Sequence, residues 1–280
     1  MLYVIHTCLL DTLLSYRPQG NIATLPTNRL NLRAIMRKLF IITSLVFSCA
    51  TATADWFFQP KLGYSSLDYE LTLGQDDSDT ATATIPTTTI GFSLVNSDGW
   101  YVDLDFTGGN DEVTNFFPET DYIENFNTTV SAGISMGSGF TLFGGFNSQD
   151  TQIENHKEQT GQYKDFQFTT QGLFGGLAKT FSLTKTQSFN ISGALGAMSG
   201  RYEALPENPA DQTFEAEGDA IGYSVATAYT YRITPKLPIT AGLKAQSYTY
   251  TDMTDLNTDV SYADAKEELT SVFIKAAYTF

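Results

Sequence analysis

The segment Glu268–Phe280 decides the fold of this chain, and it reads Glu-Leu-Thr-Ser-Val-Phe-Ile-Lys-Ala-Ala-Tyr-Thr-Phe. Counted back from the last residue, one parity consists of Phe280, Tyr278, Ala276, Ile274 and Val272, and the other of Thr279, Ala277, Lys275, Phe273 and Ser271. Side chains of a β-strand point to its two faces in alternation. The segment is therefore predicted to be a strand with one apolar face and one mixed face of smaller side chains.

Nine further alternating segments precede this strand, beginning at Trp56. Four short connections are rich in turn residues: Asn96-Ser97-Asp98-Gly99, Gly137-Ser138-Gly139, Thr184-Lys185-Thr186-Gln187 and Thr234-Pro235-Lys236. The other five are long and polar, and they cover residues 74–79, about 108–125, about 150–164, 203–218 and about 251–264. Ten strands with short and long connections in turn predict an all-β fold, a ten-stranded antiparallel up-and-down transmembrane β-barrel.

The aromatic ending, with Tyr278 two residues before Phe280, resembles the C-terminal strand of bacterial outer-membrane β-barrel proteins. The pattern extends over residues 55–280 and favours no particular family. The resemblance implies localisation in the bacterial outer membrane, with lipid and lipopolysaccharide as partners. It also implies that Tyr278 and Phe280 form an assembly signal for the barrel-assembly machinery.

Composition supports a β fold of one domain. The 280 residues are 42% hydrophobic and include 20 Phe and 15 Tyr, which favour strands. The chain contains no run of 18 or more apolar residues, which argues against a bundle of membrane helices. A soluble β-sandwich or lipocalin-like barrel is the alternative, but it does not account for the connection rhythm and the aromatic ending together.

The N-terminal region has the composition of a secretory signal peptide. Met36-Arg37-Lys38 supplies the basic region, Leu39 to Phe47 the apolar region, and the segment up to Ala54 a small-residue cleavage pattern. We expect residues 36–54 to be the signal peptide, residues 55–280 the barrel, and residues 1–35 an upstream extension of the gene model. A genuine N-terminal extension is the alternative.

Charge and cysteine content limit the chemistry of the barrel. Residues 1–54 hold five of the 16 basic residues and one of the 31 acidic ones, which leaves 11 basic and 30 acidic residues and a net charge of −19 from Asp55 onward. This balance argues against nucleic acid as a partner. Both cysteines, Cys8 and Cys49, precede Asp55, so neither disulfides nor a cysteine metal site is expected, and no cofactor is predicted.

The mixed parity should face the lumen, because a Lys or Arg facing lipid at mid-depth costs about 2–4 kcal/mol. The residues predicted to line the lumen are Lys61, Tyr101, Asp103, Asp105, Asn127, Arg232, Lys244 and Lys275. In the segment 165–183, whose facing is ambiguous, placing Lys179 inward also places Gln167, Thr169 and Gln171 inward. The two aspartates are interpreted as partners for lumen Lys and Arg side chains.

Seven glycines share the inward parity near mid-strand: Gly63, Gly91, Gly133, Gly145, Gly196, Gly222 and Gly242. They are interpreted as room for large lumen side chains, with a narrow hydrated passage as the alternative. Eight strands are just filled by side chains and sixteen leave a wide channel. Ten strands therefore favour a plugged or very narrow lumen over an open pore.

Enzymatic alternatives have weak support in the sequence. Asp103-x-Asp105 superficially resembles the aspartate pair of the omptin surface proteases. This resemblance would imply that a His-Asp couple activates water near the outer rim. From Asp55 onward the chain has one histidine, His156, with no Asp-x-His around it. A lipid A-modifying hydrolase would need a positioned base such as a Ser-His arrangement. Neither a protease nor such a hydrolase is favoured.

The sequence therefore predicts a non-enzymatic outer-membrane barrel, either a narrow porin-like pore or a structural and surface-interaction protein. Acidic side chains gather in the long connections: Asp76, Asp77, Asp79, Asp111, Glu112, Glu119, Asp121, Glu124, Asp252, Asp255 and Asp259. They are interpreted as solvated, with divalent cation binding as the alternative.

Overall fold

The computed structural model describes residues 55–73, 80–113, 121–154, 163–206, 213–257 and 264–280. The expected extension at 1–35 and signal peptide at 36–54 lie outside these residues. The described residues form ten strands: β1 (Trp56–Leu73), β2 (Thr80–Asn96), β3 (Trp100–Val113), β4 (Asp121–Ser135), β5 (Phe140–Glu154), β6 (Tyr163–Ser182), β7 (Gln187–Pro206), β8 (Phe214–Thr234), β9 (Leu237–Asp255) and β10 (Ala265–Ala277). None of the described residues forms a helix long and apolar enough to span a membrane.

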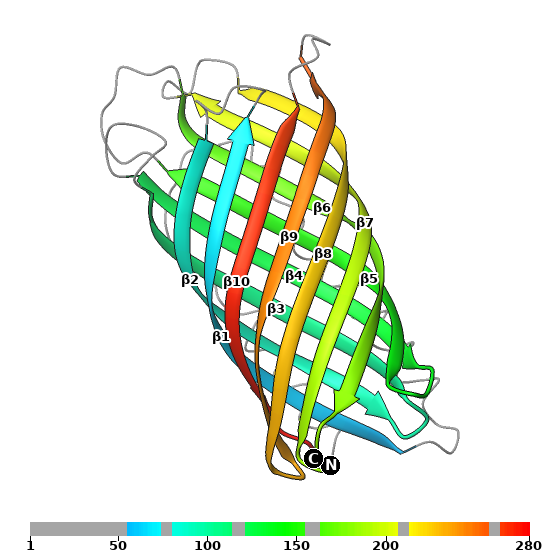
Figure 1. The fold of residues 1–280 in the computed structure, drawn as a ribbon. Helices are drawn as coiled ribbons and strands as arrows, with labels where there is room; N and C mark the ends of the chain where they lie inside the picture. Colours follow the sequence, from blue (N-terminus) through cyan, green and yellow to red (C-terminus); the bar gives the residue numbers. More distant parts are fainter. Residues whose placement is uncertain (1–54, 74–79, 114–120, 155–162, 207–212, 258–263) are drawn as a thin grey trace, which may run out of the picture. The chain divides into compact units, whose positions relative to one another are not determined.

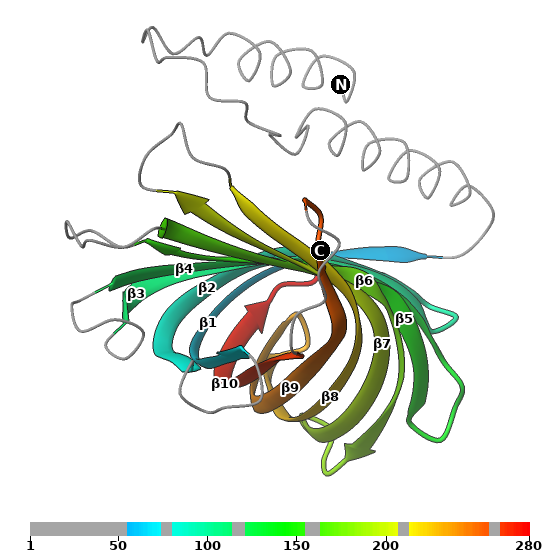
Figure 2. The same ribbon diagram turned by 90° about the horizontal axis from the view of Figure 1, so that it is seen from above.

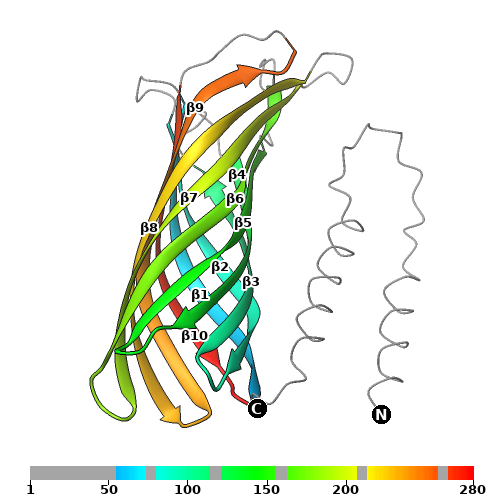
Figure 3. The ribbon, with the colours of Figure 1, turned by 90° about the vertical axis from the view of Figure 1, so that its right-hand side faces the viewer.

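The ten strands close into one antiparallel barrel, as the sequence predicted (Figures 1 and 2). Each strand pairs with its neighbours in the chain, and β1 pairs with β10 to complete the ring. The strands are long and run steeply tilted along the barrel (Figure 3). Closure leaves no unpaired sheet edge, which a β structure in hydrocarbon requires.

The last residues extend the closing seam beyond β10. The Tyr278 N–H donates to the Pro60 carbonyl at 3.1 Å, and the Phe280 N–H donates to the Phe58 carbonyl at 3.2 Å. The rings of Phe58 and Phe280 stack with their centroids 6.2 Å apart. The strand that begins at Trp56 therefore pairs with the C-terminal strand, as the sequence predicted.

The barrel has two distinct ends. We call the end where β2 leads into β3 the short-turn end, and the end where β1 ends and β2 begins the long-connection end (Figure 1). The predicted tight turns are present at the short-turn end. Gly99, with φ of +89°, and Gly137 and Gly139, with φ near +80°, adopt the left-handed conformation that glycine tolerates best.

Strands reach further toward the long-connection end than the sequence predicted. Residues 108–113, 121–125, 150–154, 203–206, 214–218 and 251–255 belong to strands, although their polarity indicated loops. Charged side chains of the outward parity in this half are exposed, whereas Asn125, Thr151 and Asp255 are buried inside. On β10, for example, Lys266 and Glu268 face outward and form an ion pair at 2.9 Å. The long-connection half of the barrel thus extends beyond its apolar belt.

The apolar belt surrounds the short-turn half. Large exposed side chains of the outward parity include Leu62, Ile90, Leu142, Leu177, Leu195, Ile221, Val225, Leu243, Val272 and Ile274. Leu195 is 69% exposed and Ile221 is 74% exposed, values that suit a lipid-facing surface. Inside the long-connection half, the opposite arrangement holds. Leu71, Ile85, Ile123, Ile153 and Phe168 point inward and form a buried core.

The predicted facing of β6 is wrong. Phe168 and Thr170 are buried inside the barrel, whereas Leu173 and Leu177 are exposed outside. Lys179 therefore faces outward near the short-turn end, where its ammonium lies 4.0 Å from the centroid of the Phe140 ring and donates to the Ser138 carbonyl. A lysine at the edge of the belt can keep its charge in the polar interface. Gln167, Thr169 and Gln171 share this outward parity.

Candidate functional site in the barrel lumen

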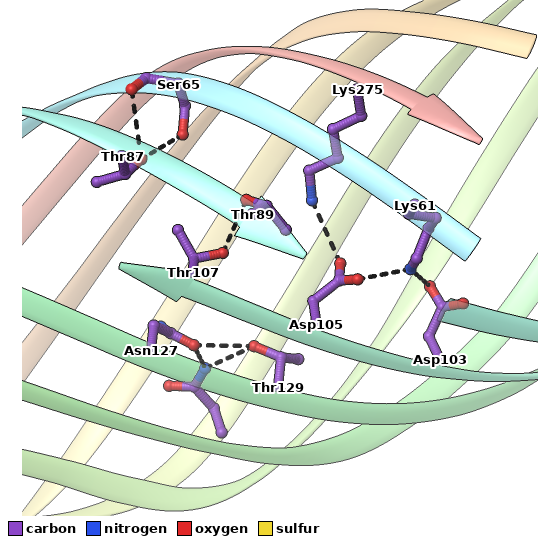
Figure 4. Close-up of polar contacts among 11 residues, drawn as sticks. Lys61, Ser65, Thr87, Thr89, Asp103, Asp105, Thr107, Asn127, Thr129 and Lys275 are labelled. Carbon is purple, nitrogen blue, oxygen red and sulfur yellow. Dashed lines mark hydrogen bonds and ion pairs between the residues drawn. The ribbon is translucent and has the colours of Figure 1, made fainter. Parts of the chain in front are cut away.

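A cluster of opposite charges lies inside the short-turn half. Lys61 Nζ is 3.1 Å from Asp103 Oδ2 and 2.7 Å from Asp105 Oδ1, and Lys275 Nζ is 3.3 Å from Asp105 Oδ2. Figure 4 shows Lys61 between the two aspartates and Lys275 on the other side of Asp105. The side chains come from β1, β3 and β10, of which β1 and β10 pair at the seam and β3 lies beyond β2 on the other side of β1. Both carboxylates therefore have cationic partners.

Neutral polar side chains continue along the lumen wall. Asn127 Oδ1 accepts hydrogen bonds from Asn147 Nδ2 at 2.9 Å and from Thr129 Oγ1 at 3.0 Å. Hydroxyl pairs link neighbouring strands, such as Ser65 with Thr87 at 2.6 Å and Thr89 with Thr107 at 2.9 Å (Figure 4). These contacts hold the polar inner face of β1 to β5 together.

A cavity of about 440 Å³ lies in the lumen on the short-turn side. Its wall includes hydroxyl and amide groups together with aromatic rings and one ammonium group: Tyr101, Asn147, Ser192, Gln246, Phe143, Phe174 and Lys244. Inward glycines make room for its large side chains. A Cβ on Gly133 would come within 2.5 Å of the Tyr101 ring, and a Cβ on Gly222 within 2.5 Å of the Tyr248 ring. The interpretation of these two glycines as room for large side chains is confirmed.

A closed layer lies above the cavity, toward the long-connection end, and it centres on Glu267. The Glu267 side chain is fully buried, and its carboxylate accepts hydrogen bonds from Gln149 Nε2 at 2.7 Å and from the Tyr250 hydroxyl at 3.1 Å. The Thr170 hydroxyl lies 3.2 Å from the same carboxylate and shares a short hydrogen bond with Tyr250. Within the described part of the chain, neither Lys nor Arg forms an ion pair with Glu267.

The Glu267 layer joins side chains from strands on different sides of the lumen. Besides Glu267, its buried members are Tyr69, Gln149, Thr151, Phe168, Thr170, Tyr248 and Tyr250, from β1, β5, β6, β9 and β10. Phe168 packs edge-to-face on Tyr250 with ring centroids 4.9 Å apart. The core of inward Ile and Leu side chains adjoins this layer. Buried side chains thus occupy the lumen at this level.

Glu267 lies outside the apolar belt, because its neighbours on the outer face, Lys266 and Glu268, are charged. Its burial raises the pKa of the carboxyl group to about 7, and the hydrogen bonds from Tyr250, Thr170 and Gln149 oppose this shift. Burial therefore changes the pKa of Glu267 more than the hydrogen-bond donors do. Glu267 is thus a carboxyl group that can change its protonation state near neutral pH.

The predicted lumen residues fall into three groups. Lys61, Asp103, Asp105 and Lys275 meet in the ion-pair cluster. Tyr101 and Lys244 line the cavity, and Asn127 belongs to the amide network beside it. Arg232 lies exposed at the end of β8 near the short-turn end. Tyr278 and Phe280 lie at the seam, with their rings 4.9 Å apart.

Sequence reasoning missed the Glu267 layer. Glu267 has the same parity as Lys275, so the alternation of β10 extended to its first residues would have placed it inside. Its partner Gln149 is 118 residues away in the chain. The tilt of the strands brings these two positions together, and local sequence does not encode that contact.

The geometry does not support an omptin-like use of Asp103 and Asp105. They are the fourth and sixth residues of β3, which begins at the short-turn end, and Lys61 binds both. The resemblance implied a pair near the outer rim. His156 lies outside the described residues. Within those residues, no group of three or more His, Cys, Asp or Glu side chains is placed to hold a metal ion.

Comparison with known proteins identifies the fold. The structure is similar to that of the outer-membrane protease OmpT from Escherichia coli, with a TM-score of 0.55 and 12% sequence identity over 82% of this chain and 98% of that protein. Two matches with lower scores are Ail, the attachment invasion locus protein of Yersinia pestis, and Neisserial surface protein A. Their TM-scores are 0.37 and 0.35, each at 12% identity, covering 81% of this chain and 99% of each protein.

No protein-family model and no curated protein sequence matches the chain. The closed ten-stranded barrel and its apolar belt nevertheless define the class of protein. It has the fold of an integral β-barrel of the bacterial outer membrane. At this level of identity the similarity to OmpT concerns the fold alone.

Proposed function

We propose that this protein is a sealed, non-enzymatic outer-membrane barrel that serves as a structural and surface-interaction protein. The observation that carries the proposal is the Glu267 layer, in which buried side chains from several strands occupy the lumen. A conducting pore needs a continuous hydrated path. The buried layer supports a plugged barrel over the porin-like alternative.

The surface beyond the apolar belt fits an interaction role. Its outward side chains are largely acidic, as in Asp68, Glu70, Glu217 and Asp219. The short turns would lie on the periplasmic side of the membrane, and this surface would lie outside the cell. Such carboxylates would bind lipopolysaccharide through divalent cations that also bind its phosphates. The Tyr278 and Phe280 ending would serve as the signal for the barrel-assembly machinery.

The enzyme alternative has less support. Asp103 and Asp105 are neutralised by lysines and lie far from the surface that would meet a substrate outside the cell. A general base must lie within hydrogen-bonding reach of the proton that it abstracts. The likeness to a protease therefore does not favour proteolysis by this aspartate pair.

Planar-bilayer recording tests the sealed barrel. Refolded protein that shows the gel shift of a heat-modifiable barrel should give no discrete conductance steps. The double variant Tyr69→Ala and Tyr250→Ala, which removes two large side chains of the Glu267 layer, should conduct and so confirm insertion. Discrete steps from the unmodified protein would overturn the proposal in favour of a porin-like pore.

A further inference from the structure

The lumen cavity carries one more positive charge than its neighbours can neutralise. Lys61 and Lys275 bind Asp103 and Asp105. Lys244, on the cavity wall, has neither a hydrogen bond nor an ion pair among the residues that the structure describes. The charges that act on it are those of Lys275, which repels it, and Asp105, which attracts it. Three ammonium groups thus share two carboxylates.

An unpaired ammonium group inside a barrel is costly unless an anion accompanies it. The volume of about 440 Å³ falls in the range of small-molecule sites, about 300–1,000 Å³. Such sites combine apolar walls with a few polar groups that fix orientation. Here Phe143 and Phe174 supply an aromatic wall, and Gln246 and Asn190 supply amide groups.

The position of the cavity limits the route of entry. Thr141 and Asn190 belong to its wall and lie near the first residues of β5 and β7, next to the short turns. Tyr248 belongs to the wall on the other side and is the register partner of Glu267. The Glu267 layer therefore closes the cavity toward the long-connection end, and a ligand would enter from the short-turn end.

We propose that this cavity binds a small amphipathic carboxylate, such as an aromatic or medium-chain monocarboxylate. The carboxylate group pairs with the ammonium of Lys244 and accepts hydrogen bonds from Gln246 or Asn190. The hydrocarbon part packs against Phe143 and Phe174. The binding itself does not depend on the sealed-barrel proposal, and only the direction of entry does.

Calorimetry on the purified protein in nanodiscs of phosphatidylcholine tests this site, with empty nanodiscs as the blank. The probe is 3-phenylpropionate, and its uncharged analogue is 3-phenylpropanamide. We expect saturable one-to-one binding of the acid with a dissociation constant of about 1 mM or tighter. The amide should bind at least about tenfold more weakly, because it cannot pair with an ammonium group.

Variants assign the binding to Lys244. Lys244→Gln should weaken binding of the acid at least about tenfold, whereas Lys179→Gln, on the outer face, should leave it unchanged. Ser192→Phe fills the cavity without removing a charge and should abolish binding. If Lys244→Gln does not fold, the Ser192→Phe variant tests the site in its place. Equal binding of acid and amide, unchanged binding by a folded Lys244→Gln or Ser192→Phe variant, or no saturable binding would overturn the proposal.

Discussion

The two halves of the barrel have opposite polarity, although the alternation of β1 continues unchanged from one half into the other. On β1, Leu62 faces outward and Lys61 inward in the short-turn half. Further along the same strand, Glu70 faces outward and Leu71 inward. The alternation is the same, and the surroundings are different. The exposed side chains fit lipid around the first half and water around the second.

This difference explains why the lumen is occupied by buried side chains at one level and is polar at another. In the short-turn half the outer face is apolar, so the polar side chains face inward and the lumen holds charges and a cavity. In the long-connection half the apolar side chains face inward and pack as they would in a soluble β-barrel. The Glu267 layer, which we propose seals the lumen, lies where this core begins.

The largest expected effect is on the free energy of unfolding, when a lysine is placed on the outer face of each half and the two costs are compared. Val225, 53% exposed, and Glu217 both face outward on β8. Val225→Lys should lower the free energy of unfolding from bilayers by about 2–4 kcal/mol, because the ammonium enters hydrocarbon. Glu217→Lys should change it by less than about 0.5 kcal/mol. Urea titration in lipid vesicles measures both, and equal costs would contradict the difference in surroundings.

Removing a lysine charge from the ion-pair cluster should lower the free energy of unfolding more than removing one from a turn. Lys61→Met leaves Asp103 without its cation and Asp105 with Lys275 alone. Because these groups are partly exposed, we expect a loss of about 2 kcal/mol rather than the 3–5 kcal/mol of a fully buried pair. Lys185→Met, in an exposed turn, is the matched control for urea titration. A loss no greater than that of the control would show that the cluster contributes nothing to stability.

Glu267 should make the long-connection half sensitive to pH. Its pKa is about 7 in the folded protein against 4.5 for an exposed glutamate, so the folded state holds the proton more tightly. The stability should therefore be greatest below pH 4.5 and fall as the pH rises to about 7, by on the order of 3 kcal/mol. Glu267→Gln should remove this fall, and Glu268→Gln, on the outer face, should retain it.

Urea midpoints at pH 5 and pH 8 measure this dependence in all three proteins. The quantity of interest is the difference between Glu267→Gln and the unmodified protein, because other groups titrate in the same range. An identical pH dependence in these two proteins would show that Glu267 does not titrate in the folded barrel.

Much of the fold followed from alternation alone. The strand number, the tight turns, the closing of β10 on β1 and the inward facing of Lys61 and Lys275 are all encoded by local pattern. The facing of β6 is not encoded in this way, because Lys179 faces outward, although a lysine in a strand favours the inner face. At the edge of the belt the Lys179 ammonium reaches polar surroundings and the Phe140 ring. A lysine at this level therefore does not indicate which side chains of its strand face the lumen.

The strand ends and the Glu267 layer could not be predicted for a related reason. Residues such as Arg201 and Glu215 form an ion pair at 2.8 Å on the outer face of β7 and β8, yet their polarity resembles that of a loop. The sequence does not indicate at which residue of a strand the surroundings change from lipid to water. The meeting of Gln149 with Glu267 across the lumen also requires the relative stagger of β5 and β10.

Thiol labelling from the two sides tests most directly whether the long-connection half seals the lumen of the short-turn half. The chain has no cysteine from Asp55 onward, so Ser131→Cys places a single thiol in the cavity wall. Lys185→Cys and Glu217→Cys mark the short-turn and long-connection sides. In oriented proteoliposomes, a membrane-impermeant maleimide should label Ser131→Cys from the short-turn side only. Labelling from the long-connection side, as fast as that of Glu217→Cys, would contradict the seal.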